Sequence, residues 1–123
     1  MSNLKALIIE DEADLAEIYT KALQREGFET ETINDGKKAI ERLASISPNV
    51  ILLDLHLPQI SGVAILEAIR ADERLKKIPV IVTTADERQA EELVNRADLV
   101  LLKPVSLNQL RELASRMANS NIK

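Results

Sequence analysis

VILLDLHLP, residues 50–58, runs four apolar side chains directly into an aspartate, Asp54, and then into a turn. A near-continuous apolar run of this length is typical of a strand covered on both faces, as in a parallel sheet. Three further runs have the same character: residues 4–9, 80–83 and 99–102. A fifth stretch, residues 29–33, alternates in polarity and carries two glutamates, which predicts an edge strand because exposed charges discourage edge pairing.

Amphipathic stretches separate these runs, and their apolar residues recur at helical spacing. The helical stretches lie within residues 15–23, 39–44, 63–69, 90–94 and 107–117. Gly27 is predicted to end the first helix, and Ser106 with Gln109 forms a capping-box pattern at the start of the last. Strand and helix alternate five times, which predicts an α/β fold: a doubly wound (βα)5 unit with a parallel five-stranded sheet, order 2-1-3-4-5, and helices on both faces.

Composition favours one globular domain spanning residues 1–123, with a short polar tail from residue 119. No apolar run approaches the roughly 20 residues of a membrane span, and the start lacks a secretory signal pattern, so a cytoplasmic location without membrane insertion is expected. The absence of cysteine excludes disulfides and cysteine-ligated metals, and a single histidine excludes a multi-histidine metal site.

Charge is unevenly distributed along the chain. The net charge is −4, and the only aromatic residues are Tyr19 and Phe28, which argues against direct nucleic-acid binding. Residues 1–31 hold eight acidic side chains against three basic ones. This excess indicates a cation site or a basic partner, although a solvated surface accounts for charge alone equally well.

Polar residues follow the predicted strands where each one ends: Glu10, Asp11, Asp54, Thr84 and Lys103. Because the carboxyl ends of parallel strands share one edge, and ligands bind where the strand order reverses, these groups are expected to converge. The carboxylates would repel one another unless a cation lies between them, and an oxygen-rich set suits Mg²⁺. One acid at this edge would indicate only a solvated surface residue, whereas acids at both neighbouring strand ends favour a cation site.

Lys103 and Thr84 each have two interpretations. Lys103 either neutralises the acids or holds a phosphoryl oxygen, and Thr84 is either a turn residue or a hydroxyl donor to a phosphoryl oxygen. Asp86 with Gln89 has the pattern of a helix cap, which would leave Thr84 free for that second role. An aspartate nucleophile with a metal, a lysine and a hydroxyl is equipped for phosphoryl transfer. Without a glycine-rich phosphate loop, the phosphate is expected to arrive on a protein rather than as a nucleotide.

Four motifs closely resemble the receiver domain of two-component response regulators, in the right order and spacing over nearly the whole chain. They are IEDE (9–12), LDLHLP (53–58), TTA (83–85) and LKP (102–104). The resemblance implies that Asp54 accepts a phosphoryl group from a sensor histidine kinase or phosphotransfer protein. It implies that Glu10 and Asp11 organise Mg²⁺, with Asp11, Asp54 and the backbone carbonyl of His56 as ligands.

The same resemblance assigns roles to the switch residues. Thr84 would move onto one phosphoryl oxygen and Lys103 would pair with another, while the bond from Lys103 to Pro104 is expected to be cis. His56 and Asp86 occupy positions that set how long the phosphoryl group survives. One departure is Val100, which stands where the family usually has an aromatic ring that rotates on activation. In place of that readout, the signal would run through Thr84 and the loop after it, or phosphate would only pass through the domain.

The resemblance also suggests how the domain would act. With no output domain expected in the chain, a single receiver would dock on a downstream protein target or relay phosphate, as a monomer or weak dimer. One alternative is a pseudo-receiver that acts without phosphate, although such modules normally lack the acceptor, an acid or the lysine. A phosphatase of the haloacid dehalogenase type usually has an acid two residues after its nucleophile, where this chain has His56. A flavin mononucleotide binder needs a hydroxyl-rich loop after the first strand, where this chain has acidic residues.

Overall fold

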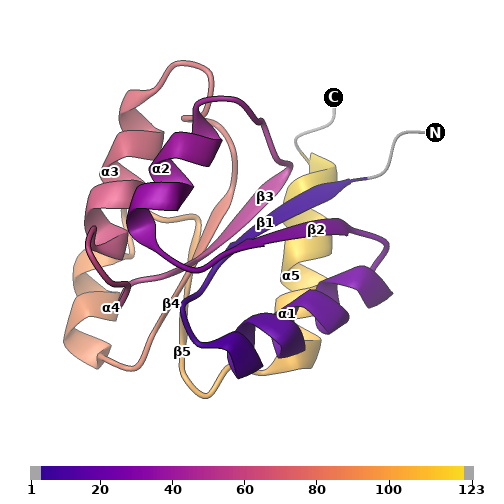
Figure 1. The fold of residues 1–123 in the computed structure, drawn as a ribbon. Coiled ribbons are helices and arrows are strands. Elements are labelled where there is room, and N and C mark those ends of the chain that lie inside the picture. The colour runs from indigo at the N-terminus through magenta and orange to yellow at the C-terminus, as the bar shows by residue number, and fades with distance from the viewer. Residues whose placement is uncertain (1–3, 121–123) are drawn as a thin grey trace.

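The computed structural model describes residues 4–120 and contains a single five-stranded parallel sheet with five helices. The elements are β1 (Lys5–Ile9), α1 (Ala13–Arg25), β2 (Glu29–Ile33), α2 (Gly36–Leu43), β3 (Val50–Asp54), α3 (Gly62–Ala71), β4 (Val80–Thr84), α4 (Glu87–Leu93), β5 (Leu99–Leu102) and α5 (Leu107–Ser120). The strand order is β2-β1-β3-β4-β5, which confirms the predicted doubly wound fold (Figure 1). Over the described residues, no helix has both the length and the apolar character to cross a bilayer.

The helices cover both faces of the sheet. α1 and α5 pack together on one face, and α2, α3 and α4 lie on the other (Figure 1). Alternation along each strand divides the core: Leu7 and Ile9 of β1 face the α2/α3/α4 side, while Ala6 and Ile8 face the α1/α5 side. This alternation decides toward which face every residue at the strand ends projects.

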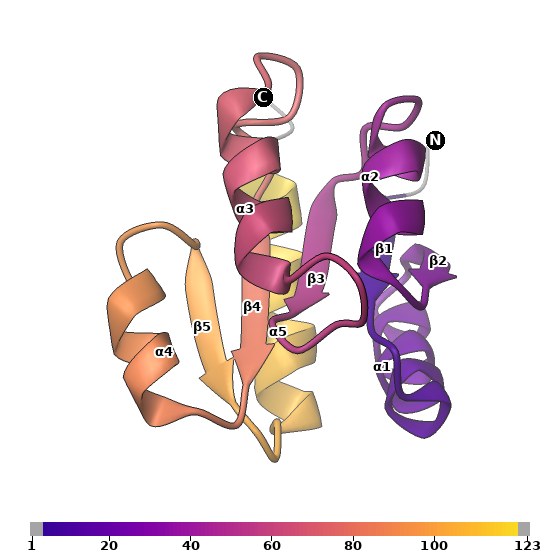
Figure 2. The same ribbon diagram turned by 60° about the vertical axis from the view of Figure 1, so that its left-hand side comes forward.

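The strands differ in burial because of their places in the sheet. β1, β3 and β4 are buried almost throughout, as their apolar runs predict, and β2 is the expected edge strand. The sequence predicts that β5 is covered on both faces, and this prediction is wrong. β5 forms the other edge of the sheet, and Leu102 is 44% exposed. Figure 2 shows β5 beside α4, a seven-residue helix whose only buried side chain is Leu93.

Short polar side chains begin the helices. Asp35, Ser61 and Asp86 accept backbone N–H groups at the first turns of α2, α3 and α4. Ser106 accepts the N–H of Gln109 at 3.2 Å, which is the forward half of the predicted capping box. α5 continues through residue 120, so the first two residues of the expected polar tail are helical, and residues 121–123 lie outside the described part.

Two glycines hold different positions. Gly27 follows α1 with φ of 93°, a left-handed conformation that ends the helix as predicted. Gly62 begins α3 directly against the end of β3: a Cβ there would lie 2.5 Å from the carbonyl oxygen of Asp54. The absence of a side chain at Gly62 therefore allows the loop after β3 to return closely under Asp54.

We expect Gly62→Ala to destabilise the protein by about 2–3 kcal/mol, because the added methyl group meets backbone that has no room to move. Gly27→Ala is the matched control: nothing lies within 4 Å of its Cβ position, so only the left-handed conformation is penalised, by about 1 kcal/mol. Urea unfolding followed by circular dichroism measures both. Equal losses would contradict the steric role of Gly62.

Candidate functional site

Three carboxylates meet at the carboxyl ends of two neighbouring strands. Glu10 and Asp11 follow β1 and Asp54 ends β3, and the pairing of β1 with β3 places these ends side by side. One carboxylate oxygen of each lies within 4.8 Å of the others. Glu10 and Asp54 are each only 2% exposed, whereas Asp11 faces solvent. The predicted convergence of these three acids is present.

Lys103 supplies the positive charge at this cluster. Its Nζ lies 3.4 Å from Oε1 of Glu10 and 3.4 Å from Oδ1 of Asp54. Two backbone N–H groups add to it: Glu12 donates to Oε2 of Glu10 and His56 donates to Oδ1 of Asp54, both at 3.2 Å. One ammonium thus pairs with two buried carboxylates, so a net negative charge remains when both carboxylates are ionised.

Burial and the neighbouring charges both shift the pKa values in the cluster. Burial raises the pKa of Glu10 to about 7; the charge of Asp54 adds to the rise, and the Glu12 N–H and Lys103 oppose it. Burial lowers the pKa of Lys103, but the negative charges of Asp54 and Glu10 outweigh it and hold that pKa above its ordinary value. Without another cation, Glu10 therefore retains a proton close to neutral pH.

The donor set fits Mg²⁺. All three ligand groups are carboxylate oxygens, and Mg²⁺ is commonly held by one or two carboxylates with water completing its octahedron. The exposure of Asp11 gives the cluster a side open to solvent, from which the ion and its waters would enter. A divalent cation would also stabilise the charged form of Glu10, whose pKa is raised by burial and, to a smaller extent, by the charge of Asp54.

Thr84 does not join this cluster and has other partners. Its Oγ1 accepts the N–H of Asp86 at 3.0 Å and lies 3.4 Å from Oε1 of Gln89, to which the hydroxyl donates. Asp86 caps α4 as predicted, accepting from the N–H groups of Arg88 and Gln89. However, the expectation that this cap leaves the Thr84 hydroxyl free of local hydrogen bonds is wrong, because the backbone N–H of Asp86 donates to that hydroxyl.

The remaining predicted residues lie around the rim or in the core. His56 is exposed and contacts Asp54 only through its backbone N–H. Val100 is partly buried and packs against the core on the α2/α3/α4 side. The peptide bond from Lys103 to Pro104 is cis.

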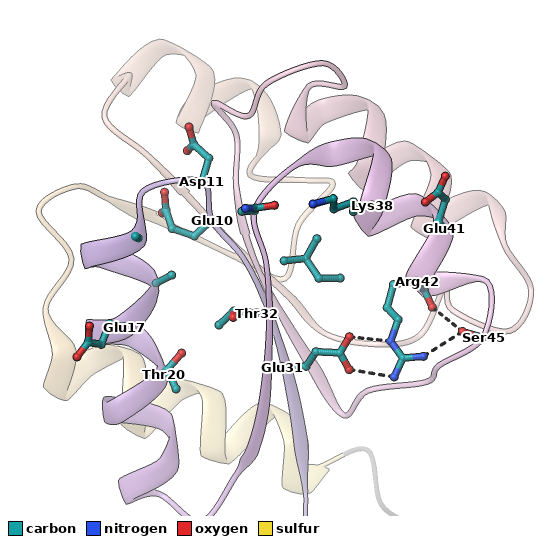
Figure 3. A pocket seen from close by; sticks show the side chains of 14 residues that line it. Glu10, Asp11, Glu17, Thr20, Glu31, Thr32, Lys38, Glu41, Arg42 and Ser45 are labelled. Atoms are coloured by element: carbon teal, nitrogen blue, oxygen red, sulfur yellow. Dashed lines mark hydrogen bonds and ion pairs between the residues drawn. The ribbon is translucent and has the colours of Figure 1, made fainter.

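A groove beside the acidic cluster is not apparent from the sequence. It has a volume of about 830 Å³ and lies between α1 and α2 over the edge strand β2 (Figure 3). Glu10 and Asp11 line one end, and an ion pair between Glu31 and Arg42, 2.6 Å apart, lies near the other. The polar character of β2 predicts an edge strand, but the spacing of the helices beside it is a tertiary property that no local pattern encodes.

Comparison with known proteins identifies the family. The sequence matches the family model of the response regulator receiver domain over residues 6–115, and the chain belongs to this family. The family is a signalling domain of two-component systems. Receiver domains bind Mg²⁺ at an acidic site, and this chain has an acidic cluster formed by Glu10, Asp11 and Asp54.

Individual relatives agree with this assignment. The DNA-binding response regulator MtrA of Mycolicibacterium paratuberculosis is 32% identical over 109 residues, which cover 86% of this chain and 47% of MtrA. The chain thus spans about half the length of that relative. The receiver domain of the Francisella response regulator 1452 superposes with a TM-score of 0.87 at 25% identity, covering 96% of this chain and 98% of that one.

A receiver domain from a histidine kinase is equally similar in structure. The signal receiver domain of a signal transduction histidine kinase from Syntrophus aciditrophicus superposes with a TM-score of 0.89 at 26% identity, covering 99% of this chain and 94% of that one. Receiver domains with this fold therefore occur both in response regulators and in histidine kinases.

The raised pKa of Glu10 predicts how stability depends on pH without divalent metal. The folded protein holds a proton on Glu10 up to about pH 7, whereas the unfolded chain releases it near 4.5. The resulting stabilisation is fully present below pH 4.5 and is lost as pH rises through about 7, so the free energy of unfolding should fall by on the order of 3 kcal/mol across that interval.

Glu10→Gln should remove this slope because it carries no titrating proton, and Mg²⁺ should reduce it in the wild-type protein. Glu41→Gln, an exposed acid of α2, is the matched control and should leave the slope unchanged. Urea titrations with chelator at several pH values measure the effect. An unchanged slope in Glu10→Gln would disprove the assignment.

Proposed function

We propose that this chain is a phosphoacceptor receiver and that Asp54 is the residue phosphorylated. The observation that carries the proposal is the carboxylate of Asp54 at the end of β3, buried among Glu10, Asp11 and Lys103. In the step, an Asp54 oxygen attacks the phosphorus of a phosphohistidine on a kinase or phosphotransfer protein. The bond from phosphorus to the histidine nitrogen breaks, and the nitrogen retains the electron pair.

Bound Mg²⁺ would neutralise charge developing on the phosphoryl oxygens. The chain's own residues would do the rest. Nζ of Lys103 lies 3.4 Å from Oδ1 of Asp54. The ammonium is therefore in reach of an oxygen of a phosphoryl group attached to Asp54. The N–H of His56 holds the Asp54 carboxylate in place, and we assign the adjacent His56 carbonyl to the metal.

Thr84 would act as the switch. Its hydroxyl is tied to the start of α4 through Asp86 and Gln89, so reaching a phosphoryl group on Asp54 requires it to release both. Phosphorylation would then alter how α4 is held. Because Val100 has no ring to rotate, we propose that this hydroxyl, rather than an aromatic side chain, passes the signal to a downstream protein target in the cytoplasm.

Retention of every required group favours this proposal over a phosphate-independent interaction module. The acceptor Asp54, the acids Glu10 and Asp11 and the lysine Lys103 are all present and lie together. Thr84 is also present but has other hydrogen-bond partners. Because the chain spans about half the length of MtrA, the output of any longer protein is separate from this proposal.

Incubation with acetyl phosphate and Mg²⁺ should add one phosphoryl group, detected by intact-mass spectrometry. Asp54→Asn should abolish the gain because it removes the nucleophilic carboxylate, and a chelator should abolish it in the wild-type protein. Asp72→Asn is the matched control, since Asp72 lies at the far end of α3 from the site, and it should react normally. A folded wild-type protein that gains no mass with Mg²⁺ would favour the interaction module.

The rim residues should control how long the phosphoryl group survives. His56→Asn and Asp86→Ala should each change the rate of hydrolysis several-fold while still allowing full phosphorylation, because both are exposed beside the site and neither holds the acceptor with its side chain. Asp86→Ala also removes a helix cap, so Asp35→Ala, which removes the cap of α2, controls for that loss. Decay followed by mass after removal of acetyl phosphate is the measurement. Unchanged decay in both variants would refute the role.

A further inference from the structure

Thr83 carries a buried hydroxyl that the site described so far does not use. The residue is 0% exposed, and its Oγ1 has no hydrogen-bond partner among residues 4–120. Leaving a buried hydroxyl unpaired is unfavourable, and most such groups in folded proteins find a partner. A valine would fill the same space in this strand without that penalty.

Register places Thr83 beside the acceptor. In the pairing of β3 with β4, the Cα partner of Thr83 is Asp54. The two side chains also project from the same face: Ile81, two residues before Thr83, and Leu52, two before Asp54, both pack in the core under α1 and α5. Lys103 follows Leu101 of that same core by two residues, so it too belongs to this face.

Thr84 belongs to the opposite face. It follows Val82 of the α2/α3/α4 core by two residues, and its hydroxyl contacts Gln89 of α4. The hydroxyls of Thr83 and Thr84 therefore lie on opposite faces of the sheet. Only Thr83 stands on the side of the Asp54 carboxylate.

We propose that Thr83 is a positioning residue for the phosphoacceptor. Neighbouring strands lie about 4.8 Å apart, a gap that a hydroxyl and a carboxylate on facing residues span with one hydrogen bond. Rotation about the Cα–Cβ bond of Thr83, which the resting structure has not made, would turn the Oγ1–H toward Asp54 during the reaction, where it would donate to the carboxylate and fix the orientation of the carboxylate for attack. This inference rests on the proposed function, because it assigns a role within the same reaction.

Thr83→Val tests the hydroxyl because the two side chains have nearly the same shape. With acetyl phosphate and saturating Mg²⁺, we expect Thr83→Val to be phosphorylated about two- to tenfold more slowly, the effect of losing one ordinary hydrogen bond. Its melting temperature should be unchanged or higher, because the buried hydroxyl is unpaired in the resting structure. Thr83→Ser, which keeps the hydroxyl, should remain within about twofold of the wild-type rate.

The outcomes separate this inference from the proposed function. If the wild-type protein is phosphorylated and Thr83→Val reacts at the same rate, the positioning role is overturned and the proposed function stands. If the wild-type protein gains no phosphoryl group, the proposed function fails and the inference with it. Should Thr83→Val unfold, Thr83→Ala against Thr83→Ser makes the same comparison, and equal rates in that pair overturn the role.

Discussion

Two carboxylates, those of Glu10 and Asp54, are buried at neighbouring strand ends with one ammonium, Lys103, between them. Burying like charges this closely is unfavourable unless positive charge compensates it, so the arrangement persists only where the rest of the fold imposes it. Parallel pairing of β1 with β3 brings the ends together, and the close return of the chain at Gly62 fixes the loop beside Asp54. The excess of negative charge at the cluster follows from the same constraint.

The sheet separates the chemistry into two sides. Glu10, Asp54 and Lys103 belong to the face covered by α1 and α5, whereas Thr84 belongs to the face covered by α2, α3 and α4. A reaction at the acceptor therefore reaches α4 only through a residue at the strand end, where the two faces meet. Alternation along β4, which places adjacent threonines on opposite faces, provides this connection.

Much of this arrangement follows from the sequence. The apolar run before Asp54 predicts a buried parallel strand, and the strand order then predicts that Asp54 and the acids after β1 meet. What the sequence does not predict depends on tertiary geometry. The hydrogen bond from the Asp86 backbone to Thr84 depends on how the loop after β4 turns, and the exposure of Leu102 depends on how little of β5 the short α4 covers. The groove beside β2 depends on the spacing of two helices.

The small buried area of α4 has a thermodynamic consequence. With Leu93 as its only buried side chain, the helix gains little from the hydrophobic core, and its first turn is held by the cap at Asp86 and the hydroxyl of Thr84. Segments with few buried contacts open locally at a much lower free energy than the core strands do. If Thr84 releases its two hydrogen bonds, as the proposed function requires, the population of α4 would shift from the docked toward the open form without disturbing the sheet beneath it.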